Sequence, residues 1–310
     1  MIGRITNQMT ASMMLSGIES DLDQLDTTQQ ELSTGLTINE PSDNPSGTSL
    51  VLALNTTQSN LTSYSNNVSD GTGWSDAATS ALSDMTNAVQ RVQELVEEAA
   101  NGTQNQSDMS ASADEVNQLI DEIKSDADTQ YNGQYIFSGS ATTTQPYQSG
   151  SDDTYAGNTA SVTREIGPGT SLAVNVDLSS VLGNGQTTSG QPSGDGLLLN
   201  TLRNIADDMQ SGNSSALSGT DLADLTNNLN SLTALSTNMG AVTDRLQMAS
   251  SRITSLQNST TDTLSNTEDA DMAATETKFS SEQAAFEAAL QGGADIVQES
   301  LMNFLGSGTG

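Results

Sequence analysis

The chain contains no cysteine and no histidine among its 310 residues. Without cysteine it can form neither disulfides nor zinc–thiolate sites, and without histidine it lacks the commonest general base and metal ligand. Aromatic residues make up only 3% of the chain and hydrophobic residues 34%, so we do not expect a thick globular core. These absences argue against an enzyme, and they predict no catalytic residues, no cofactor and no metal site.

Basic residues are also scarce, with 8 Lys and Arg against 39 Asp and Glu and a formal net charge of −31. Such a surface repels phosphate backbones and anionic lipids, so neither nucleic acid nor a membrane is an expected partner. The acidity either keeps the protein in solution by mutual repulsion or reflects a salt-rich habitat, in which ions screen that repulsion. No apolar stretch approaches the ~20 residues of a membrane span, and the first residues do not resemble a cleavable signal. Taken alone, these features predict a soluble cytoplasmic protein.

Apolar residues recur at steps of three and four near both ends of the chain, the spacing of helices that wrap around partners. The same spacing also occurs in ordinary packing within one chain, and this alternative stays open at the level of pattern. The first set, here called the N-terminal seam, comprises Leu15, Ile18, Leu22, Leu25, Leu32 and Leu36. The second comprises Val242, Leu246, Ala249, Ile253 and Leu256.

Two further helices are expected after the N-terminal seam. Asn44 followed by Pro45 is a favourable helix start, and the helix can run to about Ala100. A third helix begins near Asp108, or at a capping box made by Ser112 and Glu115, and ends near 132–133. With the second apolar set, these helices supply the predicted core of a helical rod: Leu82, Met85, Val89, Val92, Val96, Val116, Ile120, Ile123, Val242, Leu246, Ile253 and Leu256.

The sequence pattern changes after residue 133. The segment that follows is rich in Gly, Ser, Thr and Pro and contains short runs in which apolar and polar residues alternate. Residues 134–137 read as a strand, and the runs 161–166 and 171–176 flank Gly167-Pro168-Gly169, a hairpin signal. Helical pattern resumes at Leu197 and again from about Thr220. It breaks at 267–271, before a last helix with the apolar residues Phe279, Phe286, Leu290, Val297, Leu301 and Phe304, here called the C-terminal seam.

The predicted fold class is therefore mainly α, a long antiparallel helical rod or coiled-coil bundle with a small inserted β domain. Three parts are expected: terminal coiled-coil segments 1–44 with 268–310, a helical rod 45–135 with 197–267, and the β insert 136–196.

Five segments carry a family resemblance through their order and spacing: 2–9, 32–45, 132–147, 268–273 and 288–305. The most discriminating is Asn132-Gly-Gln-Tyr-Ile-Phe-Ser-Gly139 followed by Thr-Thr-Thr-Gln-Pro-Tyr147, because flagellins do not usually show it in that form. The chain resembles the bacterial flagellar hook-associated protein 3 family, the hook–filament junction proteins of the flagellin-like group.

This resemblance implies a structural subunit that joins the hook to the flagellin filament by self-assembly, with the two terminal seams as assembly surfaces. The implied partners are further copies of the chain, the adjoining hook-associated protein, flagellin on the filament side, and an export chaperone at the C-terminal segment. It implies that the terminal helices pair on assembly and are disordered in the free monomer. It also implies type III export without a cleaved signal, which replaces the cytoplasmic expectation with an extracellular flagellar location.

Two alternatives stay open. One is flagellin itself, the filament subunit, and the remote one is a secreted enzyme with its activity in the β insert. Within that insert, residues 151–157 form a loose carboxylate-bearing loop, but a calcium site needs six or more oxygen ligands and the loop has only two carboxylates. We therefore expect a solvated turn there.

Overall fold

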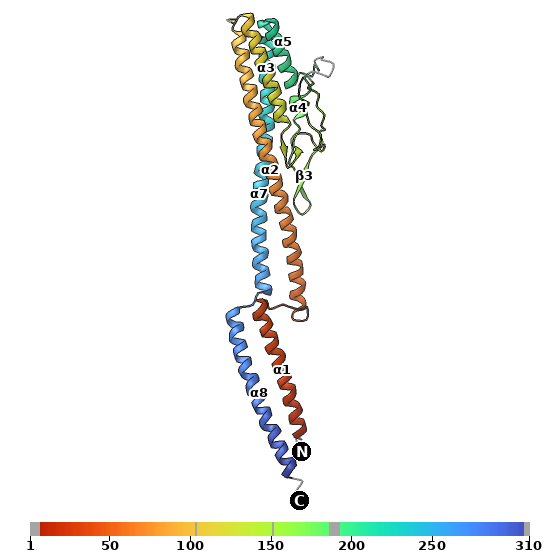
Figure 1. Ribbon diagram of the computed structural model, residues 1–310, viewed down its shortest axis with the longest axis vertical. Helices are drawn as coiled ribbons and strands as arrows, with labels where there is room; N and C mark the ends of the chain where they lie inside the picture. The colour runs from red at the N-terminus through yellow and green to blue at the C-terminus, as the bar shows by residue number, and fades with distance from the viewer. Residues whose placement is uncertain (1–6, 103, 151, 186–192, 307–310) are drawn as a thin grey trace. The chain divides into compact units, whose positions relative to one another are not determined.

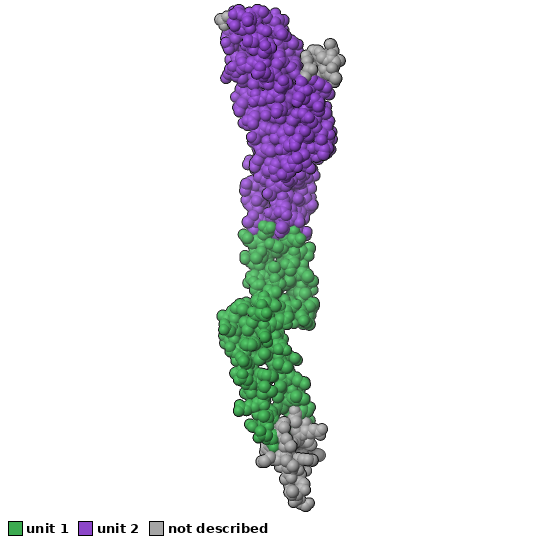
Figure 2. Space-filling view, viewed as in Figure 1, with its two compact units in different colours: residues 1–59, 257–310 green, residues 60–256 purple. Residues whose placement is uncertain are grey.

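The computed structural model describes residues 7–102, 104–150, 152–185 and 193–306, and these are mainly helical with two small antiparallel hairpins (Figure 1). This confirms the predicted fold class, mainly α with a small β region. The chain divides into two compact units, 1–59 with 257–310 (unit 1) and 60–256 (unit 2), coloured separately in Figure 2. The division falls inside two long helices, whereas the expected terminal segments and rod meet at 44/45 and 267/268.

Four helices build most of unit 2: α2 (Pro45–Ala100), α3 (Gln106–Ala127), α5 (Leu198–Ser211) and α7 (Leu222–Glu268), of which α2 and α7 also contribute residues to unit 1. The start of α2 is the predicted one, because the Asn44 side-chain oxygen accepts a hydrogen bond of 2.9 Å from the Gly47 amide. A β-carbon at Gly71 of α2 would lie 3.2 Å from both Leu246 and Val174. Glycine in mid-helix thus allows α2 to approach its neighbours closely.

The predicted start of α3 near Asp108 lies two residues from the observed one, whereas the alternative start at Ser112 and the predicted end were wrong. The helix is capped by Asn105, whose side chain accepts from the amides of Ser107 and Asp108, so it begins before either predicted start. It stops at Ala127, and Asn132-Gly133 instead connects strands β1 (Gln130–Tyr131) and β2 (Gln134–Tyr135). Both turn residues have positive φ, 50° and 76°, which is the conformation that a two-residue hairpin requires.

The hairpin predicted around Gly167-Pro168-Gly169 is confirmed, with shorter strands. Strands β3 (Thr163–Gly167) and β4 (Thr170–Ala173) pair antiparallel, with Arg164 opposite Leu172. A four-residue helix, α4 (Ser179–Leu182), follows and has no counterpart in the sequence prediction. Before α7 the chain makes the short α6 (Ser214–Ala216) and a π-helical turn, η1 (Leu217–Asp221).

The core of unit 2 lies between these helices and under the two hairpins. Of the predicted rod-core residues, all are buried except Val242, which is half-buried, and Leu256, which is 47% exposed. Trp74, the single tryptophan, is fully buried, with the Tyr131 ring edge-on at 6.3 Å and the Arg164 guanidinium 5.7 Å from its ring centre.

Unit 1 contains α1 (Asn7–Thr34) and α8 (Met272–Gly306), which pack against each other (Figure 1). The segments that connect them to α2 and α7 are joined by backbone hydrogen bonds. The Thr37 amide donates to the Glu268 carbonyl at 2.6 Å, and the Ala270 amide donates to the Gly35 carbonyl at 2.8 Å. Leu36 of the N-terminal seam forms an isolated antiparallel bridge with Asp269 in this region. These contacts hold the inner ends of α1 and α8 side by side.

Candidate functional site: the terminal helix pair

One face of α1 packs against α8, and a polar contact lies within it. The Thr28 hydroxyl, which is fully buried, donates to the Glu282 carboxylate at 2.6 Å. Nearer the chain ends, a β-carbon at Gly292 would lie 2.9 Å from Met14, and one at Gly293 would lie 3.4 Å from Ile18. These contacts pair the end of α1 with the start of α8, so the two helices run in opposite directions.

The N-terminal seam divides between two faces of α1. Ile18, Leu25 and Leu32 are half-buried and share the face of Thr28, which is turned towards α8. Leu15 and Leu22 lie about 60° further around the helix than Ile18 and Leu25 and are 59% and 43% exposed. The helix therefore has one apolar face with a partner and a second apolar face in contact with solvent.

The residues of the C-terminal seam differ in exposure. Phe279 and Phe286 are half-buried, whereas Leu290, about 40° around the helix from Phe286, is 46% exposed. Met272, which the sequence prediction did not include, is 48% exposed at the start of the same helix. The remaining predicted residues, Val297, Leu301 and Phe304, have side chains that lie outside the described residues.

Almost nothing in this pair is fully buried. Among the side chains described in α1 and α8, only Thr28 and Thr275 are buried, whereas unit 2 fully encloses large residues such as Leu82 and Ile120. Full burial of one leucine side chain contributes roughly 1.5–3 kcal/mol relative to leaving it in water. The pair therefore keeps apolar surface that a further helix could cover, as expected of a surface that is completed by association.

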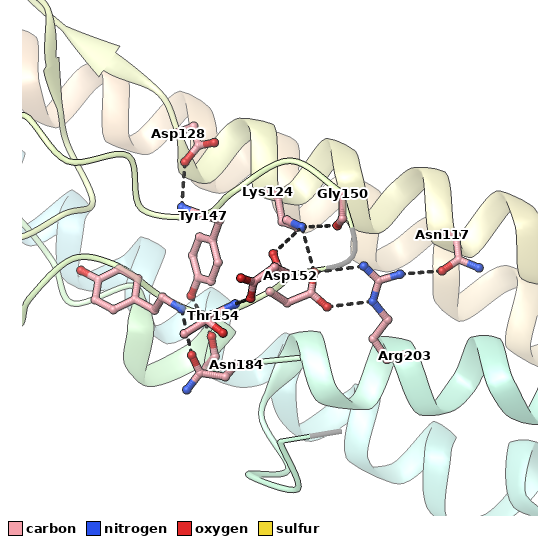
Figure 3. A network of polar contacts seen from close by, with 12 residues as sticks. Asn117, Lys124, Asp128, Tyr147, Gly150, Asp152, Thr154, Asn184 and Arg203 are labelled. Carbon is pink, nitrogen blue, oxygen red and sulfur yellow. Dashed lines mark hydrogen bonds and ion pairs between the residues drawn. The ribbon is translucent and has the colours of Figure 1, made fainter. Parts of the chain in front are cut away.

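The β insert is attached to the helices by a buried charged network (Figure 3). The Asp153 carboxylate, which is fully buried, accepts from Lys124 Nζ at 2.8 Å and from Arg203 Nε at 2.8 Å. Arg203 also donates to the Asn117 side chain at 2.7 Å, and Lys124 to the Gly150 carbonyl at 2.7 Å. The expected solvated turn was therefore wrong at Asp153, because two cations from α3 and α5 neutralise this carboxylate in the interior.

Tyr147 adds a second attachment beside this network. Its hydroxyl donates to the Gly183 carbonyl at 2.9 Å, and its amide donates to the Asp128 carboxylate at 3.1 Å. Burial raises the pKa of the Tyr147 phenol and also that of Asp128. The Tyr147 phenol therefore stays neutral and donates its hydrogen bond at pH 7. Together with the Asp153 network, the contacts of Tyr147 hold the insert on the helical bundle.

Two family models match the chain. "Bacterial flagellin N-terminal helical region" matches residues 5–142, and "Bacterial flagellin C-terminal helical region" matches residues 222–305. The chain belongs to the flagellin-like family. The matched regions contain the whole of α1–α3 and α7, and α8 up to residue 305, so the family match covers the helices of the terminal pair and most helices of the unit 2 core.

Among individual relatives, flagellar hook-associated protein 3 of Salmonella typhimurium is 28% identical over 164 residues, which are 53% of this chain and 51% of that protein. The chain thus spans about half the length of this relative. Flagellin 1 of Proteus mirabilis is 32% identical over 111 residues, 36% of this chain and 30% of that protein.

The flagellar hook-associated protein 3 structure from Legionella pneumophila shares the fold, with a TM-score of 0.59 and 15% identity over 70% of this chain and 98% of that one. Within the described ranges, no helix combines the length and apolar character that crossing a membrane requires.

Proposed function

We propose that this chain is a structural subunit of the bacterial flagellum that connects the hook to the flagellin filament by self-assembly, and that it is not an enzyme. The observation that carries the proposal is the terminal helix pair, in which Leu15, Leu22 and Leu290 are 59%, 43% and 46% exposed while unit 2 encloses its own core. Apolar surface of this kind on an elongated helix pair is suited to packing against further helices.

The relatives support the junction over the filament. The match to hook-associated protein 3 covers 53% of this chain, whereas the match to Flagellin 1 covers 36%. On this proposal, segments 1–44 and 268–310 mediate assembly, 45–135 with 197–267 form the rod, and 136–196 form the outward insert. The partners are other copies, the adjoining hook-associated protein, flagellin, and an export chaperone at the C-terminal segment, and the location is extracellular.

Deletion of the gene tests the proposal. Cells that lack the protein should make hooks without filaments and shed filament protein into the medium. Restoring the wild-type gene should restore filaments, whereas the variant Leu15→Ser/Leu22→Ser should not. Met248→Ser provides the control, because Met248 is 63% exposed on α7 in unit 2 and lies outside the terminal pair. If the protein were instead the bulk component of sheared filaments, it would be the filament subunit, and the junction proposal would be wrong.

A further inference from the structure

Helix α7 presents a locally basic face in an acidic chain. From residue 245 to residue 261 the sequence contains Arg245 and Arg252 but no carboxylate, although the net charge of the chain is −31. Both arginines are exposed and lie about two helical turns apart on one side of α7. Every other Lys and Arg among the described residues forms an ion pair, whereas these two form none. Met248 lies between them but is uncharged, so recognition by charge does not involve it.

An apolar groove borders this side of α7 at Arg252. It has a volume of about 310 Å³ and lies between α2, α7 and the β3–β4 hairpin, within unit 2. Its lining includes Leu61, Tyr64, Ile166, Pro168, Arg252 and Leu256. Leu256 is 47% exposed, and Arg252 donates one long hydrogen bond, of 3.4 Å, to the Ile166 carbonyl. We call Arg245, Arg252 and this groove the basic face of α7.

Helix α1 carries the complementary charges at the same spacing. It contains Asp and Glu but no Lys or Arg. Glu19 and Asp26 are exposed and about two helical turns apart, and Leu15, one turn before Glu19, is 59% exposed. Counted from Leu15, these two carboxylates lie about 6 and 16.5 Å along the helix axis. Counted backwards from Leu256, the two arginines of the basic face lie at the same two heights.

We infer that α1 of one copy binds the basic face of α7 of a second copy, with the two helices antiparallel. Glu19 then meets Arg252. Asp26 meets Arg245, and Leu15 lies at the groove. Because each copy carries a net charge of −31, a basic face is where another copy can approach without like charges meeting. This contact rests on the proposed function for self-assembly and deepens it by naming the two surfaces that meet.

The occupant is a second copy because the antiparallel pairing cannot form within one chain. The Thr37 amide, just after α1, donates to the carbonyl of Glu268, the last residue of α7. Both helices run towards this joint, so α1 laid along α7 of its own chain would be parallel to it. A parallel arrangement that pairs the carboxylates with the arginines places the polar Gln30 at the groove and Leu15 against Ala241. Only the antiparallel arrangement satisfies the charges and the groove together.

Sedimentation velocity of this chain, at fixed protein concentration and about 0.15 M salt, tests the pairing. Arg252→Glu should lower the association constant by roughly 10-fold, because Glu19 then meets a like charge. The double variant Glu19→Arg/Arg252→Glu restores opposite charges across the contact and should recover wild-type association. Far-UV circular dichroism checks that each variant keeps its helical content.

The matched control is Glu19→Arg/Arg245→Glu, which has the same net charge as the first double variant. In the antiparallel arrangement both of its reversed positions face like charges, so it should associate at least as weakly as Arg252→Glu. If wild-type copies associate but Arg252→Glu has no effect, or the control recovers association as well as the first double variant does, the inference is overturned and the proposed function is unaffected. If the wild type does not associate at any concentration, the proposed function is contradicted and the inference with it.

Discussion

Replacing Asp153 with asparagine should strongly destabilise unit 2. The carboxylate is fully buried, and its partners Lys124 and Arg203 have side chains only 3% and 12% exposed. An amide can still accept a hydrogen bond but carries no charge, so the substitution leaves two cations without their counter-ion in the interior. Breaking a buried ion pair in this way costs about 3–5 kcal/mol, a large share of the stability of an ordinary domain.

Urea unfolding followed by tryptophan fluorescence measures this effect, because Trp74 is the only tryptophan and is buried in unit 2. Glu115→Gln is the matched control. It removes a carboxylate that accepts from Arg91 at 2.8 Å, but the two side chains are 42% and 47% exposed, so solvent replaces the lost contact and the midpoint should change little. Equal midpoint shifts for the two variants would refute the argument that burial makes the Asp153 network important.

Two further predictions concern unit 2. Burial, with the neighbouring carboxylate of Asp208, raises the pKa of Asp221 to about 6. The folded state therefore binds this proton more tightly than the unfolded state does, and the resulting stability is complete below about pH 4 and lost as pH rises through about 6. Asp221→Asn should accordingly gain about 1–3 kcal/mol relative to the wild type between pH 5 and pH 8; an identical pH dependence of the two urea midpoints would contradict this. Gly139→Ala should destabilise by about 2 kcal/mol or more, because Gly139 has φ +62° and a β-carbon there would overlap the Asn158 carbonyl. Gly169→Ala, at φ +63° with open space around it, should cost clearly less in the same unfolding assay, and equal costs would show that the overlap is relieved.

Local signals explain what could be predicted about the fold. Asn44-Pro45 marks the start of α2 because an acceptor side chain and a preset φ act within one turn of the helix. The dipeptide Asn132-Gly133 misled the prediction because the same residue types end helices and form tight hairpins. Only the pairing of β1 with β2 decides between the two uses.

Long-range contacts explain most of what was missed. The partners of Asp153 lie 29 and 50 residues away in the chain, and nothing near it in the sequence distinguishes it from an exposed loop acid. In the N-terminal seam, the steps of three and four correctly indicated a helix with apolar residues. The same steps placed in one set residues that pack against α8 and residues that are exposed to solvent. Ile18 and Leu25 face α8, whereas Leu15 and Leu22 face solvent, and only the packing of α8 separates them.

Amide hydrogen exchange in α1 and α8, measured on this chain before and after association, tests the central claim most directly. We expect rapid exchange in the monomer, because the pair has no buried apolar centre of its own, and strong protection once other copies cover its exposed leucines. If α1 and α8 in the monomer were already as well protected as α2 and α3, their apolar surfaces would need no further partner, and the central claim would be contradicted.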